Sequence, residues 1–178
     1  IDGSLRFDSD KSTHLTRTPS SAGNQRTWTL SLWVKMGEFD LSESGGTWNR
    51  GAFLSQVSGP TIWNDATNRH FAHGWDPSGT DYCKRCIAEC RDFSSWYHVV
   101  YTTDTTQSTD TDRWKIYVNG ELQSLETPSG LNGYPAQNTE LTINAAALHR
   151  IGTFNNLTAY FDGYLSEYYF IDGQVLGP

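Results

Sequence analysis

Alternation of apolar and polar residues with a period of two is the feature that most constrains the fold of this chain. Over residues 27–35 the apolar side chains of one face occupy every second position: Trp28, Leu30, Leu32 and Val34. This period places successive side chains on opposite faces of an extended strand. Residues 96–102 and 114–118 alternate in the same way, and Asn119-Gly120 follow the second segment. Asn-Gly is typical of tight hairpin turns, so the pattern predicts antiparallel strands.

Turn-forming residues separate further short segments of this kind. The expected strands cover residues 4–8, 14–17, 27–35, 51–57, 70–75, 82–90, 96–102, 114–118, 121–125, 148–154 and 160–171. We expect a bend or bulge at Asp162-Gly163, and residues 144–149 offer the one candidate for a helical turn. Many short strands without intervening helices favour two facing antiparallel sheets. Four tryptophans lie within these segments and are expected in the core: Trp28, Trp33, Trp96 and Trp114.

The length and charge of the chain limit its class. With 178 residues, no internal repeat and no long linker, we expect a single domain over residues 1–178. Because it starts at Ile1 and stops at Pro178, we expect it to be a piece of a longer polypeptide. There are 20 acidic and 13 basic residues, a formal net charge of −7, which disfavours nucleic-acid binding. No apolar run is long enough to cross a bilayer, and no signal peptide opens the chain.

Ordered blocks along nearly the whole chain carry a family resemblance. They are residues 4–8, 16–24, 28–35, 96–101, 115–122 and 161–167. In this order they resemble laminin-G-like, concanavalin A-like jelly-roll domains, which implies an all-β, two-sheet antiparallel jelly-roll sandwich. Residues 134–139 and 170–174 resemble a narrower version, found in virion proteins of tailed, often marine, bacteriophages.

We expect a binding role and no catalysis. We expect a virion surface module, in a capsid decoration, fibre or tail protein, that attaches to glycans or host receptors or stabilises the particle. Its partners would then be a glycan or host-surface receptor, other virion proteins and further copies of itself. The alternative is a secreted or cell-surface lectin-like adhesion module. A glucanase is a third possibility, because the same fold hosts such enzymes.

The glucanase alternative depends on one acidic motif. Glu38, Asp40 and Glu43 have the spacing Glu-x-Asp-x-x-Glu that resembles the nucleophile, tuning residue and acid/base of laminarinase-type glucanases. Gly37 precedes the motif and Ser44-Gly45-Gly46 follow it, which is the context of a turn. We therefore expect a solvated acidic loop here, and no catalytic residues.

Three tryptophans are the candidate glycan-binding residues. Trp48, Trp63 and Trp75 stand in loop or loop-edge contexts beside Gly, Asn and Asp. An exposed indole offers a flat apolar face to the C–H side of a sugar ring. Packing beneath a loop or against a neighbouring subunit is the alternative for the same residues.

Two carboxylates are the candidate calcium ligands. Many laminin-G-like domains bind Ca²⁺ at the rim of the sandwich through carboxylates and backbone carbonyls. Asp8 and Asp162 lie beside expected loops near the two ends of the chain, which pair in this fold. The alternative is that both side chains only shape turns through bonds to nearby backbone N–H groups.

The chain has three cysteines, Cys83, Cys86 and Cys90. With His70, His73 and His98 they could supply a zinc site. On a strand, however, Cys83 and Cys86 would point to opposite faces. One disulfide, or buried or edge thiols without a bond, are the other possibilities, and an odd number of cysteines does not indicate a disulfide scaffold.

Overall fold

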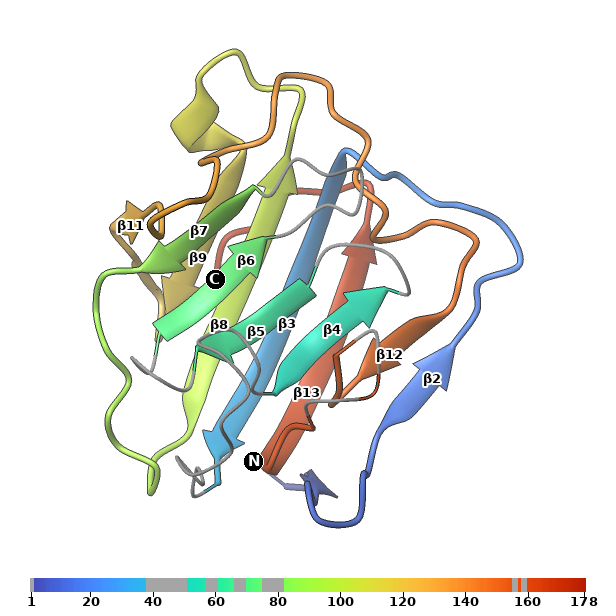
Figure 1. Cartoon of the computed structure of the whole chain (residues 1–178), viewed down its shortest axis with the longest axis vertical. Helices are drawn as coiled ribbons and strands as arrows, with labels where there is room; N and C mark the ends of the chain where they lie inside the picture. Colours follow the sequence, from blue (N-terminus) through green and yellow to red (C-terminus); the bar gives the residue numbers. More distant parts are fainter. Residues whose placement is uncertain are drawn as a thin grey trace.

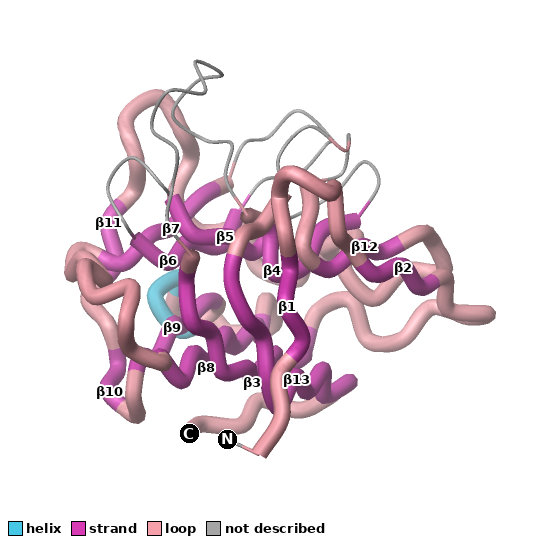
Figure 2. Tube along the Cα trace, turned by 90° about the horizontal axis from the view of Figure 1, so that it is seen from below, coloured by secondary structure: helices cyan, strands magenta, loops and turns pink. Residues whose placement is uncertain are grey.

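The structure is a computed structural model that describes residues 2–37, 51–56, 61–65, 70–74, 82–154, 157 and 160–178. Its strands form two stacked sheets, seen one in front of the other in Figure 1 and edge-on in Figure 2. Every pair of neighbouring strands is antiparallel. This confirms the expected all-β sandwich.

The rear sheet in Figure 1 has six strands. In spatial order they are β1 (Leu5–Phe7), β13 (Gly163–Asp172), β3 (Thr27–Met36), β8 (Tyr97–Asp104), β9 (Trp114–Val118) and β10 (Glu121–Leu122). The front sheet has seven, which are β11 (Leu125–Glu126), β7 (Cys83–Cys86), β6 (His70–Gly74), β5 (Thr61–Asp65), β4 (Ala52–Gln56), β12 (His149–Ile151) and β2 (Leu15–Arg17). Helical structure in the described chain consists of a single 3-10 turn, η1 (Asp110–Asp112). No described helix is long and apolar enough to span a membrane.

The core fills the space between the sheets, and the period of two decides which residues enter it. In β3 the predicted face, from Trp28 to Met36, is buried, and Ser31 and Lys35 on the other face are only half-buried. Trp114 and Ile116 of β9, two strands away in the same sheet, are buried as well. At the β9–β10 turn, Asn119 and Gly120 have φ of 50° and 86°, as the hairpin prediction requires.

Several predicted elements are wrong in detail. The expected strand 121–125 divides: β10 pairs with β9, and β11 crosses to pair with β7 in the other sheet. Strand β5 was not predicted. The helical turn lies at η1 and not at residues 144–149.

Two of the four tryptophans predicted in the core lie elsewhere. Trp33 is half-buried on the outer face of β3, stacked on His98 with ring centroids 5.1 Å apart. Trp96 precedes β8, is half-buried, and has its ring 6.4 Å from that of Tyr164. Alternation identifies the two faces of a strand. The presence of a tryptophan does not by itself show whether its face is the buried or the outer one.

A β-bulge in β13 redirects its second half. Ser166 pairs with Trp33 and Tyr169 with Ser31, so three steps along β13 match two along β3. Glu167, inside the bulge, has φ of 47°. The inward face therefore changes from odd positions before the bulge to even positions after it. The predicted bend was placed at Asp162-Gly163, several residues too early.

Candidate ligand-binding site

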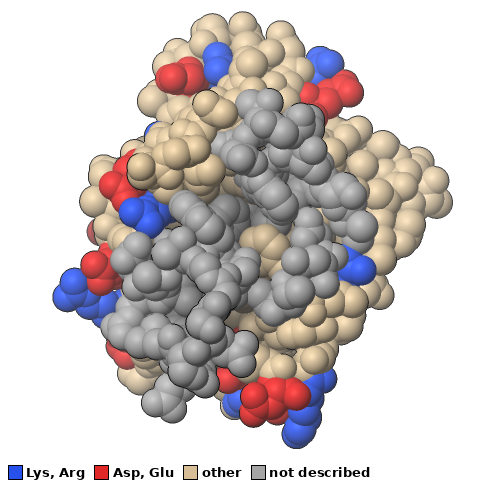
Figure 3. Space-filling view, viewed as in Figure 1, with Lys and Arg blue, Asp and Glu red and all other residues tan. Residues whose placement is uncertain are grey.

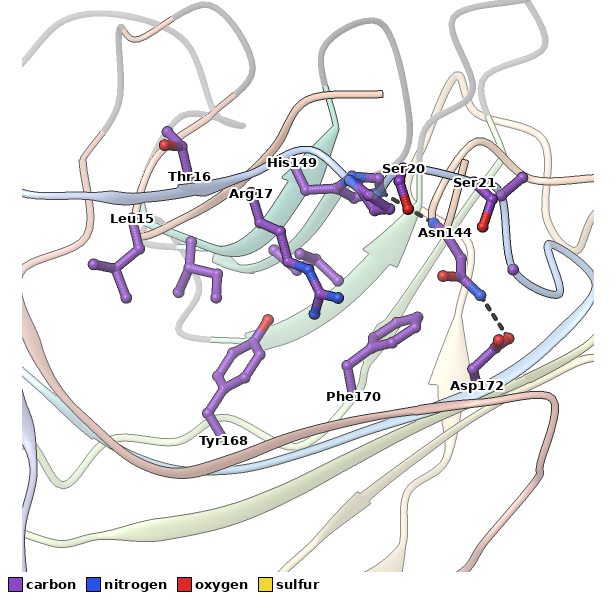
Figure 4. Close-up of a pocket in the computed structure, with 15 residues that line it drawn as sticks. Leu15, Thr16, Arg17, Ser20, Ser21, Asn144, His149, Tyr168, Phe170 and Asp172 are labelled. Atoms are coloured by element: carbon purple, nitrogen blue, oxygen red, sulfur yellow. Dashed lines mark hydrogen bonds between the residues drawn. The ribbon is translucent and has the colours of Figure 1, made fainter. Parts of the chain in front are cut away.

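A cavity of about 680 Å³ opens between the sheets, at the edge where β2 and β12 face β13 (Figure 4). This volume lies within the range of roughly 300–1,000 Å³ that is usual for small-molecule sites. We call it the sheet-edge cleft. Its lining is Leu15, Thr16, Arg17, Pro19, Ser20, Ser21, Ala22, Gly23, Leu54, Asn144, His149, Ile151, Tyr168, Phe170 and Asp172.

Two aromatic rings from β13 form one wall of the sheet-edge cleft. The bulge turns Tyr168 and Phe170 inward, and both stay half-buried. Phe170 also packs on Trp28, with ring centroids 5.5 Å apart. Burial raises the pKa of Tyr168, so its hydroxyl stays protonated and donates a hydrogen bond to the Phe53 carbonyl, 3.2 Å away. The rings are thus anchored from behind and present apolar surface to the cleft.

Hydrogen bonds hold the polar wall in place. The Asn144 backbone, at φ of 71°, donates its N–H to His149 Nε2 at 3.1 Å. His149 Nδ1 lies 2.8 Å from the Ala147 carbonyl, which makes Nδ1 the protonated nitrogen of a neutral ring. Burial, and to a smaller extent the charge of Arg17, lower the pKa of His149 and favour this neutral form. The Asn144 side chain donates to Asp172 at 2.6 Å, and the Asn24 backbone N–H donates to the same carboxylate oxygen at 2.7 Å.

Arg17 enters the cleft from the edge strand. It pairs with His149 in the β2–β12 register, which places both side chains on the inner face of the sheet. Figure 4 shows the guanidinium pointing into the space between β2 and the rings of Tyr168 and Phe170. Arg17 remains exposed, so a ligand could reach it from solvent.

A second cavity, of about 380 Å³, shares Leu15, Ile151 and Tyr168 with the first. It extends the opening towards β1, where its lining includes Leu5, Phe7 and Leu165. The two cavities together make an elongated cleft along one edge of the sandwich. Such a shape suits a chain-like ligand better than a compact one.

The candidate glycan-binding tryptophans are not among the described residues that line this cleft. Trp48 and Trp75 fall outside the described residues. Trp63 lies in the middle of β5, between Ala52 of β4 and Ala72 of β6, and not in a loop as expected. Its side chain is outside the described part of the chain, so its contact with sugar stays a prediction. On the face seen in Figure 3, the charged side chains of described residues lie towards the periphery.

The candidate calcium ligands flank the paired residues Phe7 of β1 and Gly163 of β13, and each has a cationic partner. Asp162 forms an ion pair with Arg6 at 2.8 Å, and Asp8 lies 3.5 Å from the Lys11 ammonium. Asp8 also accepts a hydrogen bond from the Lys11 backbone N–H at 3.3 Å, as in the turn-shaping alternative. Within the described residues, no group of three His, Cys, Asp or Glu side chains is arranged to hold a metal ion. Calcium binding at Asp8 and Asp162 stays a prediction.

The three cysteines are all described, and they form no disulfide. Cys83 packs with Ala52 and Ala72 on the outer face of the front sheet, whereas Cys86 and Cys90 belong to the core. The opposite orientation of Cys83 and Cys86 is thus confirmed. Burial raises the pKa of the Cys90 thiol to about 12 and raises that of Cys86 as well, which favours protonated thiols. Glu38, Asp40 and Glu43 lie outside the described residues.

Sequence reasoning missed the sheet-edge cleft because its residues come from distant parts of the chain. Arg17 and His149 are 132 positions apart and meet only through the β2–β12 pairing, which no local pattern reveals. A charged residue at the end of the expected strand 14–17 was the one available indication.

The fold and the cleft define a class of protein, a jelly-roll sandwich with a ligand-sized opening between its sheets. The family model Laminin_G_3, described as the concanavalin A-like lectin/glucanases superfamily, matches residues 8–176. The chain belongs to this superfamily. No match was found among curated proteins.

Solved structures share this fold at low sequence identity. The CBM40 of the Ruminococcus gnavus IT-sialidase, bound to alpha2,3 sialyllactose, is 14% identical with a TM-score of 0.54, over 93% of this chain and 94% of that one. The binding domain of botulinum neurotoxin serotype G is 13% identical with a TM-score of 0.63, over 98% of this chain but only 40% of that one. A heptameric SAP-like pentraxin from Limulus polyphemus is 14% identical with a TM-score of 0.51, over 88% of this chain and 68% of that one. At these identities the likeness concerns the fold alone.

Proposed function

We propose that this domain is a non-catalytic carbohydrate-binding module and that its ligand occupies the sheet-edge cleft. The observation that carries the proposal is the composition of the cleft. The apolar rings of Tyr168 and Phe170 lie across from the polar groups of Arg17 and Asn144, and His149 holds Asn144 in place. Sugars need both an apolar surface for C–H groups and oriented polar groups for hydroxyls. The fold shared with CBM40, which is bound to a sugar, supports this assignment.

The test is to fill the cleft and measure binding. Leu15 is 46% exposed and lines both cavities, so Leu15→Trp would occupy ligand space. Leu122→Trp is the matched control, since Leu122 is 58% exposed and lies on β10, at the far edge of the other sheet. A glycan array would find the ligand, and calorimetry would compare the two variants. We expect Leu15→Trp to weaken binding by roughly tenfold or more and Leu122→Trp to leave it unchanged.

Two outcomes would overturn the proposal. The first is equal binding by both variants, which would place the ligand elsewhere, for example at Trp48, Trp63 or Trp75. The second is hydrolysis of laminarin that Glu38→Gln abolishes, which would favour the glucanase alternative over a binding module.

We further propose that the parent polypeptide is a virion protein that displays this domain on the particle surface. The likeness of residues 134–139 and 170–174 to virion versions of the family supports this. Repeated copies on a symmetric particle would turn weak single-site binding into avid attachment. A density map of the assembly is the test: a shell or fibre is expected, and a membrane-anchored adhesin would contradict it.

We also propose that Asp8 and Asp162 contribute to a calcium site at the rim. A calcium-dependent rise in melting temperature that Asp8→Asn removes would support this site. A melting temperature that does not respond to calcium or to chelator would contradict it.

A further inference from the structure

We propose that the sheet-edge cleft selects glycans that carry a carboxylate, with Arg17 as the group that binds the anion. This inference rests on the proposed carbohydrate-binding function and names the class of ligand.

The first observation is that Arg17 has no ion-pair or hydrogen-bond partner in the described part of the chain. Other described arginines are engaged: Arg6 with Asp162, Arg26 with Glu140, Arg85 with Glu126 and Arg91 with Glu89. Arg113 donates to three backbone carbonyls. The guanidinium of Arg17 forms neither an ion pair nor a hydrogen bond with any residue in the described ranges, although it lines a cavity.

The second observation is the charge of the lining. Among the described lining residues, Arg17 alone carries a positive charge at neutral pH, because burial lowers the pKa of His149 and the Asn144 N–H donates to its unprotonated Nε2. Asp172 is the one acidic residue among the described residues of the lining. It forms no ion pair with Arg17, and one of its oxygens accepts two hydrogen bonds from Asn24 and Asn144. The described lining therefore holds one cation without an ion pair beside an apolar wall.

The third observation is the chemistry of this cation. A guanidinium presents its N–H donors in a planar fork that matches a carboxylate, and such paired, charge-assisted bonds are stronger than neutral ones. The formal charge of the whole chain is −7, so an acidic ligand gains nothing from long-range attraction. Preference for an anion must then come from direct contact at Arg17, which makes one substitution a decisive test.

The elongated shape of the cleft adds a constraint on size. A sugar unit against Tyr168 and Phe170 would leave the second cavity, towards Leu5 and Phe7, for a neighbouring unit. We therefore expect acidic oligosaccharides to bind more tightly than single acidic sugars.

The experiment compares acidic oligosaccharides with their carboxyl-reduced products. Fragments of polygalacturonate, alginate and hyaluronan are each measured by calorimetry beside the reduced form, which differs only where a carboxylate has become a hydroxymethyl group. Wild-type protein is expected to prefer at least one acidic form by about tenfold or more. Arg17→Gln should abolish this preference, because it weakens binding of the acidic form far more than that of the reduced form, and the two forms should then bind within about twofold of each other. Arg17→Lys, which keeps the charge but loses the fork, should retain part of it.

Arg91→Gln is the matched control, because it removes the same charge from an exposed arginine near the opposite edge of the front sheet. It should keep the full preference. Since Arg17 is exposed on an edge strand, its variants should fold, and their melting curves would check this. Equal binding of acidic and reduced forms, or a preference that survives in Arg17→Gln, would overturn the inference and leave the proposed function standing. Absence of binding to every glycan tested would contradict both.

Discussion

Two histidines face the space between the sheets, and their surroundings differ. His73 lies at the centre of the core, fully buried, with its ring 4.2 Å from that of Trp114 and 5.3 Å from that of Trp28. Neither of its nitrogens has a hydrogen-bond partner among the described residues. His149 lies in the wall of the sheet-edge cleft, where both of its nitrogens are engaged, with Asn144 and Ala147.

The difference shows how one interior serves two purposes. At the centre, stacked rings exclude water, and a polar ring persists there only in its neutral form: burial lowers the pKa of His73 to about 3. At the edge, the sheets leave room for a ligand. The polar groups there either form hydrogen bonds within the protein or, like Arg17, have no partner among the described residues. Stability should therefore depend on the centre, and binding on the edge.

The largest expected effect is on the free energy of unfolding, from a change in the core around His73. Trp114→Ala would remove the ring that stacks on His73 and leave a cavity, at a cost of about 3–5 kcal/mol in the free energy of unfolding. Trp33→Ala is the control, because Trp33 is only half-buried on the outer face and should cost less. Urea unfolding measures both. Equal losses would mean that the centre is not the more tightly packed region.

The next effect concerns pH. The pKa of His73 is about 3 in the folded chain and near 6.5 when unfolded, so the unfolded state binds the extra proton between these values. Stability from this group is fully present above pH 6.5 and falls as the pH drops towards 3. Between pH 6.5 and 4.5 the loss is roughly 2–3 kcal/mol. His73→Phe keeps the stacked ring and should remove this part of the acid sensitivity.

Urea unfolding at several pH values compares the two proteins. The difference between their unfolding free energies should change with pH in favour of the variant as the solution is acidified. If the unfolding free energies of the two proteins change equally with pH, the pKa of His73 does not differ between the folded and unfolded states. Other groups, including His149, are common to both proteins and cancel in the difference.

The smallest effect concerns the cleft wall. His149→Phe removes both bonds of the ring and leaves the Asn144 N–H without its acceptor, at a cost of about 1–2 kcal/mol. It should also weaken glycan binding, because the same Asn144 orients Asp172. His98→Phe, on the outer face of β8, is the control and should leave binding unchanged. An unchanged binding constant in His149→Phe would show that the polar wall does not contribute to glycan binding.

The fold could be predicted where local pattern decides structure. Alternation from Trp28 to Val34 and the Asn119-Gly120 turn need only neighbouring residues, and both were confirmed. Strand β5 was missed because its short segment shows no clean alternation and is flanked by turn-forming residues. The crossing of β11 to the other sheet depends on its partner β7, which lies about 40 residues earlier.

The sheet-edge cleft was much less predictable. Its aromatic wall depends on a bulge at Glu167, and its polar wall on the contact of Asn144 with Asp172, 28 residues away. The prediction chose Trp48, Trp63 and Trp75 because a tryptophan beside Gly, Asn or Asp is easy to recognise in a sequence. An arginine in an edge strand becomes notable only when the structure shows that no described residue forms an ion pair with it.

Chemical-shift mapping tests the central claim, that the opening between the sheets is the ligand site. Backbone amide spectra would be recorded while a glycan found on the array is added. Shifts should concentrate at residues 15–23, 144–151 and 168–172. Shifts confined to the outer face of the front sheet, at residues 52–56, 70–74 and 83–86, would contradict the account.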